Sequence, residues 1–313
     1  MAFRSGFVSI IGRPNAGKST LLNALVGEKV AIVTAKPQTT RTRIQGIVNV
    51  KARRGRPAGQ IIFVDTPGVH KPDSRLNRRM MQEIHAALEN RDLALLIVDA
   101  TDRFGPADQH VIDLVKRSGG VALLLLNKID NLQKDKLLPL IDRYSRLHEF
   151  HEIIPISARK RDGLNTLVDK IIDVLPEGPR YFPEDQLTDQ PERFIASEII
   201  REKVLLSTGK EIPYATAVII DRYEEMEKLT RIAATIYCER EGQKAILIGK
   251  GGQKLKEMGT AARLELEGLL GKKVFLQLFV KVKPGWRESE AFVQELDWKR
   301  QLEDLAAANR QED

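Results

Sequence analysis

The fold of the N-terminal half follows from residues 12–19, which read Gly12-Arg13-Pro14-Asn15-Ala16-Gly17-Lys18-Ser19. An apolar run over residues 7–11 precedes this stretch, and a helical pattern over residues 19–26 follows it. A strand, a G-x-x-x-x-G-K-[ST] loop and a helix in this order predict a phosphate-binding loop, whose backbone amides and helix N-terminus face phosphate oxygens. The residues expected to bind the nucleotide here are Gly12, Asn15, Ala16, Gly17, Lys18, Ser19 and Thr20.

Two side chains of this loop have predicted chemical roles. Lys18 would reach the β- and γ-phosphates as a catalytic charge, and Ser19 would bind Mg²⁺.

Asp65-Thr66-Pro67-Gly68 follows a second apolar run, residues 61–64. Asp65 would hold Mg²⁺ through water, while the Gly68 amide would meet the γ-phosphate and move when it leaves. Alone, this tetrapeptide is an ordinary turn. The prediction therefore rests on its position between two other nucleotide-binding motifs.

A third motif concerns the base. Asn127-Lys128-Ile129-Asp130 directly follows the apolar run 121–126. The Asp130 carboxylate can accept hydrogen bonds from N1–H and the 2-amino group of guanine, neither of which adenine offers. Ser157-Ala158 follows the last apolar run, residues 153–156, so the Ala158 amide could meet guanine O6. The sequence therefore predicts GTP or GDP as the ligand.

Apolar runs alternating with helical patterns predict an α/β fold with a mostly parallel sheet. The more alternating segment 44–50 is expected to pair antiparallel with 61–64, and Pro155 indicates that 153–156 lies at an edge. The predicted organisation is a GTP-binding domain over 1–176, a proline-rich linker over 177–191, a smaller domain over 192–285 and a C-terminal tail or helix over 286–313.

The smaller domain has helix, strand, strand, helix and strand patterns over 192–206, 215–223, 229–239, 253–270 and 274–282. The loop Gly249-Lys250-Gly251-Gly252 precedes its last long helix, and a G-x-x-G loop lets backbone approach RNA closely. Residues 240–285 hold ten lysines and arginines against four glutamates, which favours RNA over a solvated basic surface. The predicted RNA-binding residues are Ile248, Gly249, Lys250, Gly251, Gly252 and Lys254.

Several other side chains have open interpretations. Ile246, Ile248 and Leu255 could line an RNA groove or belong to the core. Trp286 could stack on a base, although a buried anchor is favoured. The basic turn of Lys51, Arg53, Arg54 and Arg56 is interpreted as solvated, with an auxiliary RNA contact as the alternative. Cys238 is expected to be a buried strand residue.

The composition limits the compartment and the partners. The 313 residues carry a formal net charge of +7, which favours a polyanionic partner. The single cysteine cannot form an internal disulfide, so a reducing cytoplasm is expected. The chain also has no apolar run long enough to span a bilayer.

These motifs resemble those of the translation-factor-related GTPases. Together with Pro37-Gln38-Thr39-Thr40-Arg41 and a C-terminal G-x-x-G module, the chain is similar to the Era-like GTPases. The resemblance implies a type II KH domain, binding to the 3′ end of 16S ribosomal RNA, and a role in 30S subunit assembly and maturation. It also implies peripheral contact with the inner membrane, and a monomer is expected. By alignment with this family, Thr40 rather than Thr39 would close onto Mg²⁺; the alternative is a polar loop.

Val69 departs from the Ras-like pattern, in which a glutamine after Gly68 orients water. A valine cannot do so, and slow hydrolysis is expected. In related GTPases an asparagine at the position of Asn15 helps to bind K⁺, which could compensate; the alternative is that Asn15 only caps the loop. Val69 also favours a second function, a GTP-loaded RNA clamp with negligible hydrolysis. A tRNA-modification GTPase is a third interpretation, disfavoured by the G-x-x-G module and the lack of a C-terminal catalytic cysteine.

Overall fold

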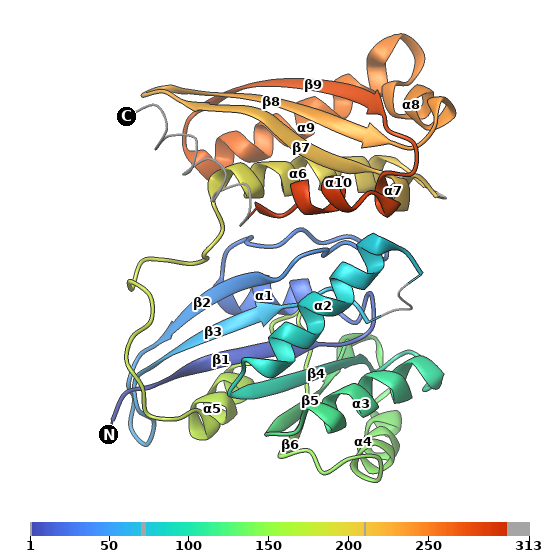
Figure 1. Cartoon of the computed structure of the whole chain (residues 1–313). Helices are drawn as coiled ribbons and strands as arrows, with labels where there is room; N and C mark the ends of the chain where they lie inside the picture. Colours follow the sequence, from blue (N-terminus) through green and yellow to red (C-terminus); the bar gives the residue numbers. More distant parts are fainter. Residues whose placement is uncertain (1, 70–72, 210, 299–313) are drawn as a thin grey trace. The chain divides into compact units, whose positions relative to one another are not determined.

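The structure is a computed structural model that describes residues 2–69, 73–209 and 211–298 (Figure 1). Two compact units divide near residue 190, and residues 73–78 group with the second unit. The first unit contains the nucleotide motifs, and the second contains the G-x-x-G loop. Each unit has its own hydrophobic core, so each is described by itself.

The first unit is built on a six-stranded sheet with the order β2-β3-β1-β4-β5-β6. Neighbouring strands are parallel except for the antiparallel pair β2–β3, as the sequence predicts. The predicted edge position of residues 153–156 is confirmed, because β6 is the last strand. The strands are β1 (Arg4–Ile11), β2 (Ile44–Val50), β3 (Gly59–Asp65), β4 (Leu93–Asp99), β5 (Ala122–Asn127) and β6 (Glu152–Pro155).

Helices cover both faces of this sheet. Leu21 of α1 and Leu167 of α5 pack in one apolar cluster with Ile10, whereas Ile84 of α2 and Ile112 of α3 belong to another. The central strands are therefore buried on both sides, which explains their almost unbroken apolar runs. The helices are α1 (Lys18–Val26), α2 (Arg75–Glu89), α3 (Pro106–Ser118), α4 (Leu137–Ser145) and α5 (Leu164–Val174).

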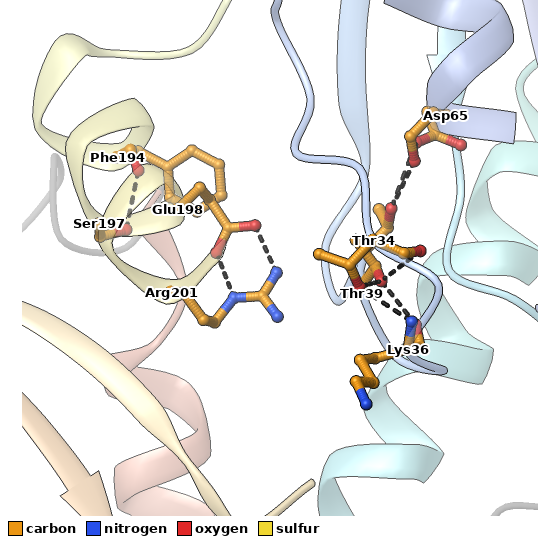
Figure 2. Close-up of polar contacts among 10 residues, drawn as sticks. Thr34, Lys36, Thr39, Asp65, Phe194, Ser197, Glu198 and Arg201 are labelled. Carbon is orange, nitrogen blue, oxygen red and sulfur yellow. Dashed lines mark hydrogen bonds and ion pairs between the residues drawn. The ribbon is translucent and has the colours of Figure 1, made fainter. Parts of the chain in front are cut away.

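The second unit is an α+β module with a three-stranded sheet in the order β7-β8-β9. Strand β8 runs antiparallel to β7 and parallel to β9, and α6 and α9 cover the inner face of the sheet. Arg201 of α6, almost fully buried, donates to the Glu198 carboxylate one turn earlier (Figure 2). The elements are α6 (Glu192–Ser207), α7 (Ile212–Ala215), β7 (Ala217–Glu225), β8 (Leu229–Cys238), α8 (Glu241–Ile248), α9 (Gln253–Leu270), β9 (Lys273–Val282) and α10 (Glu290–Glu295).

The predicted order of helices and strands is present, and the short helices α7 and α8 are additional to it. Helix α8 covers residues 241–248, a segment for which the sequence predicts neither a helix nor a strand. It is short, and it buries Gln243 and Leu247 one turn apart. Such a short apolar segment has no clear period in the sequence, because one buried pair fits a strand as well as a helix.

Residues 177–189 form no helix or strand, but they are hydrogen-bonded along the edge of the first sheet. The Ile47 amide of β2 donates to Leu187 O at 2.9 Å, and Thr188 Oγ1 donates to Gln45 O at 2.7 Å. The fully buried Gln60 side chain of β3 accepts from the amides of Tyr181 and Phe182 at 2.8 and 2.9 Å. We call residues 177–189 the strap. It covers the edge strand β2, whose unpaired amides would otherwise face solvent.

The C-terminal residues pack against the second unit as far as the structure describes them. Trp286 is fully buried and its Nε1 donates to Ala215 O at 2.8 Å, which confirms the interpretation as an anchor. Cys238 is also fully buried, as predicted. Residues 299–313 of the predicted tail lie outside the described residues. Over the described ranges, no helix combines the length and apolar character needed to cross a membrane.

Candidate functional site

The phosphate-binding loop runs from Gly12 to Gly17 between β1 and α1. Gly17 has a φ of +104°, and a Cβ on it would lie 2.2 Å from Asn127 Nδ2. A Cβ on Gly68 would lie 2.7 Å from Pro14 N. Only glycine therefore lets the loop close against the guanine motif on one side and against residue 68 on the other.

Lys18 lies at the base of this loop. Its Nζ donates to the carbonyls of Gly12 and Arg13 at 3.1 and 2.9 Å. Burial lowers the pKa of Lys18 to about 8, although the nearby Asp65 carboxylate acts in the opposite direction. The lysine is thus held inside the loop by backbone oxygens, where phosphate oxygens could replace those partners.

The three predicted magnesium ligands converge. Ser19 Oγ donates to Asp65 Oδ2 at 2.6 Å, and it lies 2.8 Å from Thr40 Oγ1. Thr40 Oγ1 in turn lies 3.3 Å from the same carboxylate oxygen. Thr39 instead donates to Lys36 O at 2.6 Å, so the structure brings Thr40, and not its neighbour, to this cluster.

The cluster fits a divalent cation. Asp65 is fully buried, and its Oδ1 has no hydrogen-bond partner among the described residues. Burial raises the pKa of Asp65 to about 6, against the opposing effects of Lys18 and of hydrogen bonds from Ser19, Thr40 and Thr66. Two hydroxyls and a carboxylate with an unused oxygen are ligands that Mg²⁺ accepts. A cation there would add to the positive charge that Lys18 already places near this buried carboxylate.

The loop that carries Thr40 is held by side-chain hydrogen bonds. Thr34 Oγ1 lies 2.7 Å from Thr39 Oγ1 and accepts from the Lys36 amide at 3.0 Å (Figure 2). Asn15 Nδ2 donates to Ala35 O at 3.0 Å, which joins the phosphate-binding loop to this segment. Residues 32–40, which we call the cover segment, therefore form an ordered wall beside the phosphate-binding loop.

Asn127 connects the two ends of the nucleotide site. Its Nδ2 donates to Ala16 O at 2.8 Å, and its Oδ1 accepts from the Ala158 amide at 3.0 Å. Ser157 Oγ donates to Asp130 Oδ1 at 2.7 Å, which orients the carboxylate predicted to bind guanine. Asp130 itself is exposed to solvent. Selectivity for guanine needs a carboxylate shielded from water, so the bound base itself would have to cover Asp130.

One cavity of about 620 Å³ joins these parts. Its wall includes Lys18, Ser19, Gly68 and Asp130, so residues from all three motifs face the same space. Lys128 also lines the cavity and forms an ion pair with Asp99. The remaining lining residues are Pro14, Asn15, Gly17, Thr20, Ile32, Val33, Thr34, Ala35, Lys36, Gln38, Thr39, Thr40, Asn127, Asn131, Ala158 and Arg159. Asn131 and Arg159 were not predicted, because neither belongs to a motif.

Val69 follows Gly68 of the cavity wall, but its side chain is packed in the core. It is 5% exposed and belongs to an apolar cluster, and its amide donates to Gly12 O at 3.2 Å. A buried aliphatic side chain cannot orient a water molecule. The structure thus agrees with the expectation that this position supplies no catalytic group.

A groove in the second unit begins at the G-x-x-G loop. Gly249, Gly251 and Gly252 have φ values of +72°, +59° and +77°, a conformation that favours glycine. The groove has a volume of about 350 Å³. It is lined by Gly252, Leu255, Lys256, Gly259, Thr260, Arg263, Leu276 and Leu278.

The lining of this groove differs in part from the groove wall that the sequence interpretation considered. Leu255 lines it, but Ile246 and Ile248 on α8 are not among its lining residues. Leu276 and Leu278 of β9 come from a strand later in the chain, and Gly259 lets β9 approach, since a Cβ would lie 3.3 Å from the Leu278 side chain. In the sequence, a glycine in the middle of a helix was the only signal for this close packing.

The basic turn after β2 makes contacts within the first unit. Arg53 and Arg56 both pair with Asp169 of α5, and Arg56 Nη2 also donates to Lys51 O at 3.1 Å. These contacts favour a structural role for the two arginines over the auxiliary RNA contact that the sequence left open.

Comparisons with known proteins match both units. Residues 7–128 match the family described as 50S ribosome-binding GTPase, and residues 211–287 match the KH domain family. The chain is 50% identical over 298 residues to GTPase Era of Syntrophus aciditrophicus, covering 95% of each protein. It is 51% identical to GTPase Era of Geobacter metallireducens, covering 95% of this chain and 98% of that one.

The chain belongs to the GTPase Era family.

Two solved Era structures are similar to this fold. One is a single-residue variant of Aquifex aeolicus Era bound to GDP·AlF₄⁻, with a TM-score of 0.89 and 41% identity over 94% of this chain and 98% of that one. The other is Era in complex with MgGDPNP and nucleotides 1506–1542 of 16S ribosomal RNA, with a TM-score of 0.90 at the same identity and coverage. The predicted P-loop GTPase fold with a C-terminal KH domain is confirmed. Hydrolysis of GTP is the activity of this family.

Proposed function

We propose that this chain is a GTP-hydrolysing switch that binds the 3′ end of 16S ribosomal RNA and acts in assembly and maturation of the 30S subunit. The observation that carries the proposal is the pairing of two sites in one chain. A single cavity collects the three nucleotide motifs, and a basic, glycine-edged groove occupies the KH domain. The Era complex with nucleotides 1506–1542 of 16S ribosomal RNA supports the choice of RNA.

In this proposal each residue of the nucleotide site has one task. Lys18 binds the β- and γ-phosphates, while Ser19, Thr40 and Asp65 would hold Mg²⁺. When bound, the cation neutralises charge that develops on the phosphates. The Gly68 amide meets the γ-phosphate, and Asn127, Asp130 and the Ala158 amide orient guanine. Thr40 and Gly68 are thus the positions that report whether the γ-phosphate is present.

Multiple-turnover GTP hydrolysis, with and without the RNA segment 1506–1542, tests the proposal. We expect RNA to stimulate hydrolysis, and we expect Gly251→Asp to remove the stimulation because a carboxylate repels phosphate where backbone must approach it. Gly268→Asp is the matched control, because Gly268 is an exposed glycine of α9 outside the groove. Tight RNA binding with hydrolysis that stays negligible would favour the GTP-loaded clamp instead, as the buried Val69 would allow.

The proposal also includes K⁺ at Asn15 as a substitute for a catalytic side chain. The supporting observation is that Asn15 lies in the cavity wall and contacts the cover segment through Ala35. Hydrolysis in KCl should exceed hydrolysis in NaCl, and Asn15→Ala should remove the difference. Equal rates in the two salts would leave Asn15 as a loop cap. The cytoplasmic location, the peripheral membrane contact and the monomeric state stay predictions.

A further inference from the structure

The outer face of the KH sheet exposes large aromatic side chains. Along β9 the side chains alternate, and Leu276 and Leu278 face the groove while Phe275 and Phe279 face away from it. Phe275 is 51% exposed and Phe279 is 50% exposed. Phenylalanine is mostly buried in folded proteins, and two on one open sheet face need an explanation. They are four residues apart on one strand, a separation of about 13 Å.

The register places polar side chains beside the Phe275 ring. Arg231 of β8 is directly opposite Phe275, and Ala233 is opposite Gln277. Beside the small Ala233 lies a hollow of about 240 Å³. Its wall includes Arg222, Arg231 and Phe275, so a flat ring placed there would meet an aromatic face and two guanidinium groups.

Other parts of the face are already occupied. Phe292 of α10 packs edge-on against Tyr237, which covers the end of the face near Lys281. Thr235, opposite Phe279, donates from Oγ1 to the Asp221 carboxylate at 2.8 Å. The open part of the face therefore centres on Phe275 and Phe279.

The charge of this face favours an anionic partner. The acidic side chains beside it are Asp221, Glu224 and Glu267. Glu224 pairs with Arg222, and Glu267 Oε2 lies 4.0 Å from Lys273 Nζ. Among the described residues, no carboxylate pairs with Arg231 or Lys281. Cross-strand pairing and alternation place four basic residues on the face: Arg222, Arg231, Lys273 and Lys281. Positive charge is therefore in excess around the two exposed rings.

We propose that this outer face is a second binding surface for single-stranded RNA, separate from the groove, on which bases stack on Phe275 and Phe279. Arg231, Lys273 and Lys281 would contact the phosphates. Exposed aromatics on a sheet, interleaved with lysine and arginine, are what sequence-tolerant RNA surfaces use. A protein partner or a second copy of the chain would gain from the rings but not from the surrounding positive charge. The inference rests on the proposed RNA binding and extends it to a longer RNA path.

Two RNA lengths separate the face from the groove. A fragment of about four nucleotides suits a G-x-x-G loop alone, whereas the segment 1506–1542 is long enough for both surfaces. We expect the double variant F275A/F279A to bind the short fragment within about twofold of the parent. It should bind the long RNA at least about thirtyfold more weakly, since each of the two stacked bases contributes a factor of about five or more. Gly251→Asp should weaken both. The control is L138A/L206A, which removes two exposed leucines from α4 and α6.

A second variant and a direct readout keep the test decisive. R231E/K281E should reduce the dependence of affinity on salt for the long RNA, because two phosphate contacts are lost. Crosslinking of 4-thiouridine-substituted RNA to the full chain should label the Phe275–Phe279 peptide.

Each contrary outcome has one meaning. Unchanged affinity for the long RNA in F275A/F279A, with crosslinks only at the G-x-x-G loop, would overturn the proposal. Dimers of the parent chain that F275A/F279A abolishes would overturn it in favour of self-association. Failure of Gly251→Asp to affect any RNA would count against the proposed function instead.

Discussion

Lys18 and Asp65 are two buried charges at the base of the nucleotide cavity, and burial moves their pKa values toward each other. The pKa of Lys18 falls to about 8 and that of Asp65 rises to about 6. Both groups are therefore charged between these values, where their attraction offsets part of the cost of burying them. Such a pair is suited to a site that exchanges internal partners for phosphate and a cation, since neither charge is fully satisfied by the protein.

The two shifts have opposite consequences for stability. Asp65 binds its proton more tightly in the folded state than in the unfolded chain, whose value is 3.8, so the free energy of unfolding falls as pH rises from about 4 to about 6. Lys18 binds its proton less tightly when folded than at its ordinary value of 10.5, so the free energy of unfolding rises between about pH 8 and pH 10.5.

Asp65→Asn should therefore stabilise the protein while it removes function. Removal of the buried charge is expected to raise the free energy of unfolding at about pH 7.5 by about 1–3 kcal/mol. It should also flatten the pH dependence between about pH 4 and 6, and Mg²⁺-dependent GTP binding should be lost. Urea denaturation without nucleotide, at several pH values, measures the first two effects. Asp135→Asn removes an exposed carboxylate as the control; an Asp65 variant less stable than the parent near neutral pH would contradict the argument.

Ser157 is a positioning residue for the guanine site. Its hydroxyl donates to Asp130 at 2.7 Å, and Asp130 is exposed, so this hydrogen bond restrains a side chain that solvent would otherwise let move. A hydrogen bond to a charged group contributes about 1 kcal/mol at such a half-open site, so Ser157→Ala should weaken GDP binding about fivefold. Titration with a fluorescent guanine nucleotide checks this. Ser145→Ala, which removes a hydroxyl from α4, should leave the affinity unchanged; an equal loss in both variants would argue against the role.

At the scale of elements, local motifs could be predicted from the sequence, and surfaces assembled from distant segments could not. The phosphate-binding loop, Asp65-Thr66-Pro67-Gly68 and the guanine motif are contiguous, and each follows a buried strand whose apolar run is easily read. The groove of the second unit instead joins the start of α9 to alternate residues of β9. No spacing rule connects Gly259 with Leu278, because the β9 register depends on how the whole unit packs.

The strap shows the same limit in another form. Its prolines and lack of period predict a linker, and the strap forms no helix or strand. Its attachment depends on backbone groups, for which composition carries no signal. One side-chain clue is Gln60, a fully buried amide beside the apolar residues 61–64 of β3. A buried polar side chain needs partners, and here the strap supplies them.

Gln60→Leu should release the strap from the sheet. The variant leaves the half-buried amides of Tyr181 and Phe182 without their acceptor, which costs about 1–2 kcal/mol while the strap stays in place. Because opening of the strap avoids that cost, we expect residues 177–189 to exchange amide hydrogens faster and to be cut first in limited proteolysis. Gln109→Leu on α3, which loses only a side-chain contact with Asp113, is the control. Unchanged protection of the strap would show that Gln60 does not hold it.

At the scale of the whole molecule, the nucleotide cavity and the proposed RNA-binding surfaces lie in two separate compact units of one chain. Communication between them is a coupling free energy, and it acts equally in both directions. If the GTP-bound form binds RNA more tightly than the GDP-bound form, then RNA must favour GTP over GDP by the same factor. Thr40 is the residue from which such coupling should begin, since it is the cover-segment hydroxyl that reaches Ser19 and Asp65.

Thr40→Ala should therefore uncouple the two units. In the parent we expect the RNA segment 1506–1542 to bind at least about fivefold more tightly with a non-hydrolysable GTP analogue than with GDP, as typical coupling energies give. Saturating RNA should raise the ratio of analogue to GDP affinity by an equal factor. Both factors should fall toward one in Thr40→Ala, with GDP affinity retained, because this hydroxyl is proposed to close onto Mg²⁺ when the γ-phosphate is present. Thr166→Ala is the control, since it removes an exposed hydroxyl from α5 outside the cavity. Equal RNA affinities in the two nucleotide states of the parent would contradict the switch.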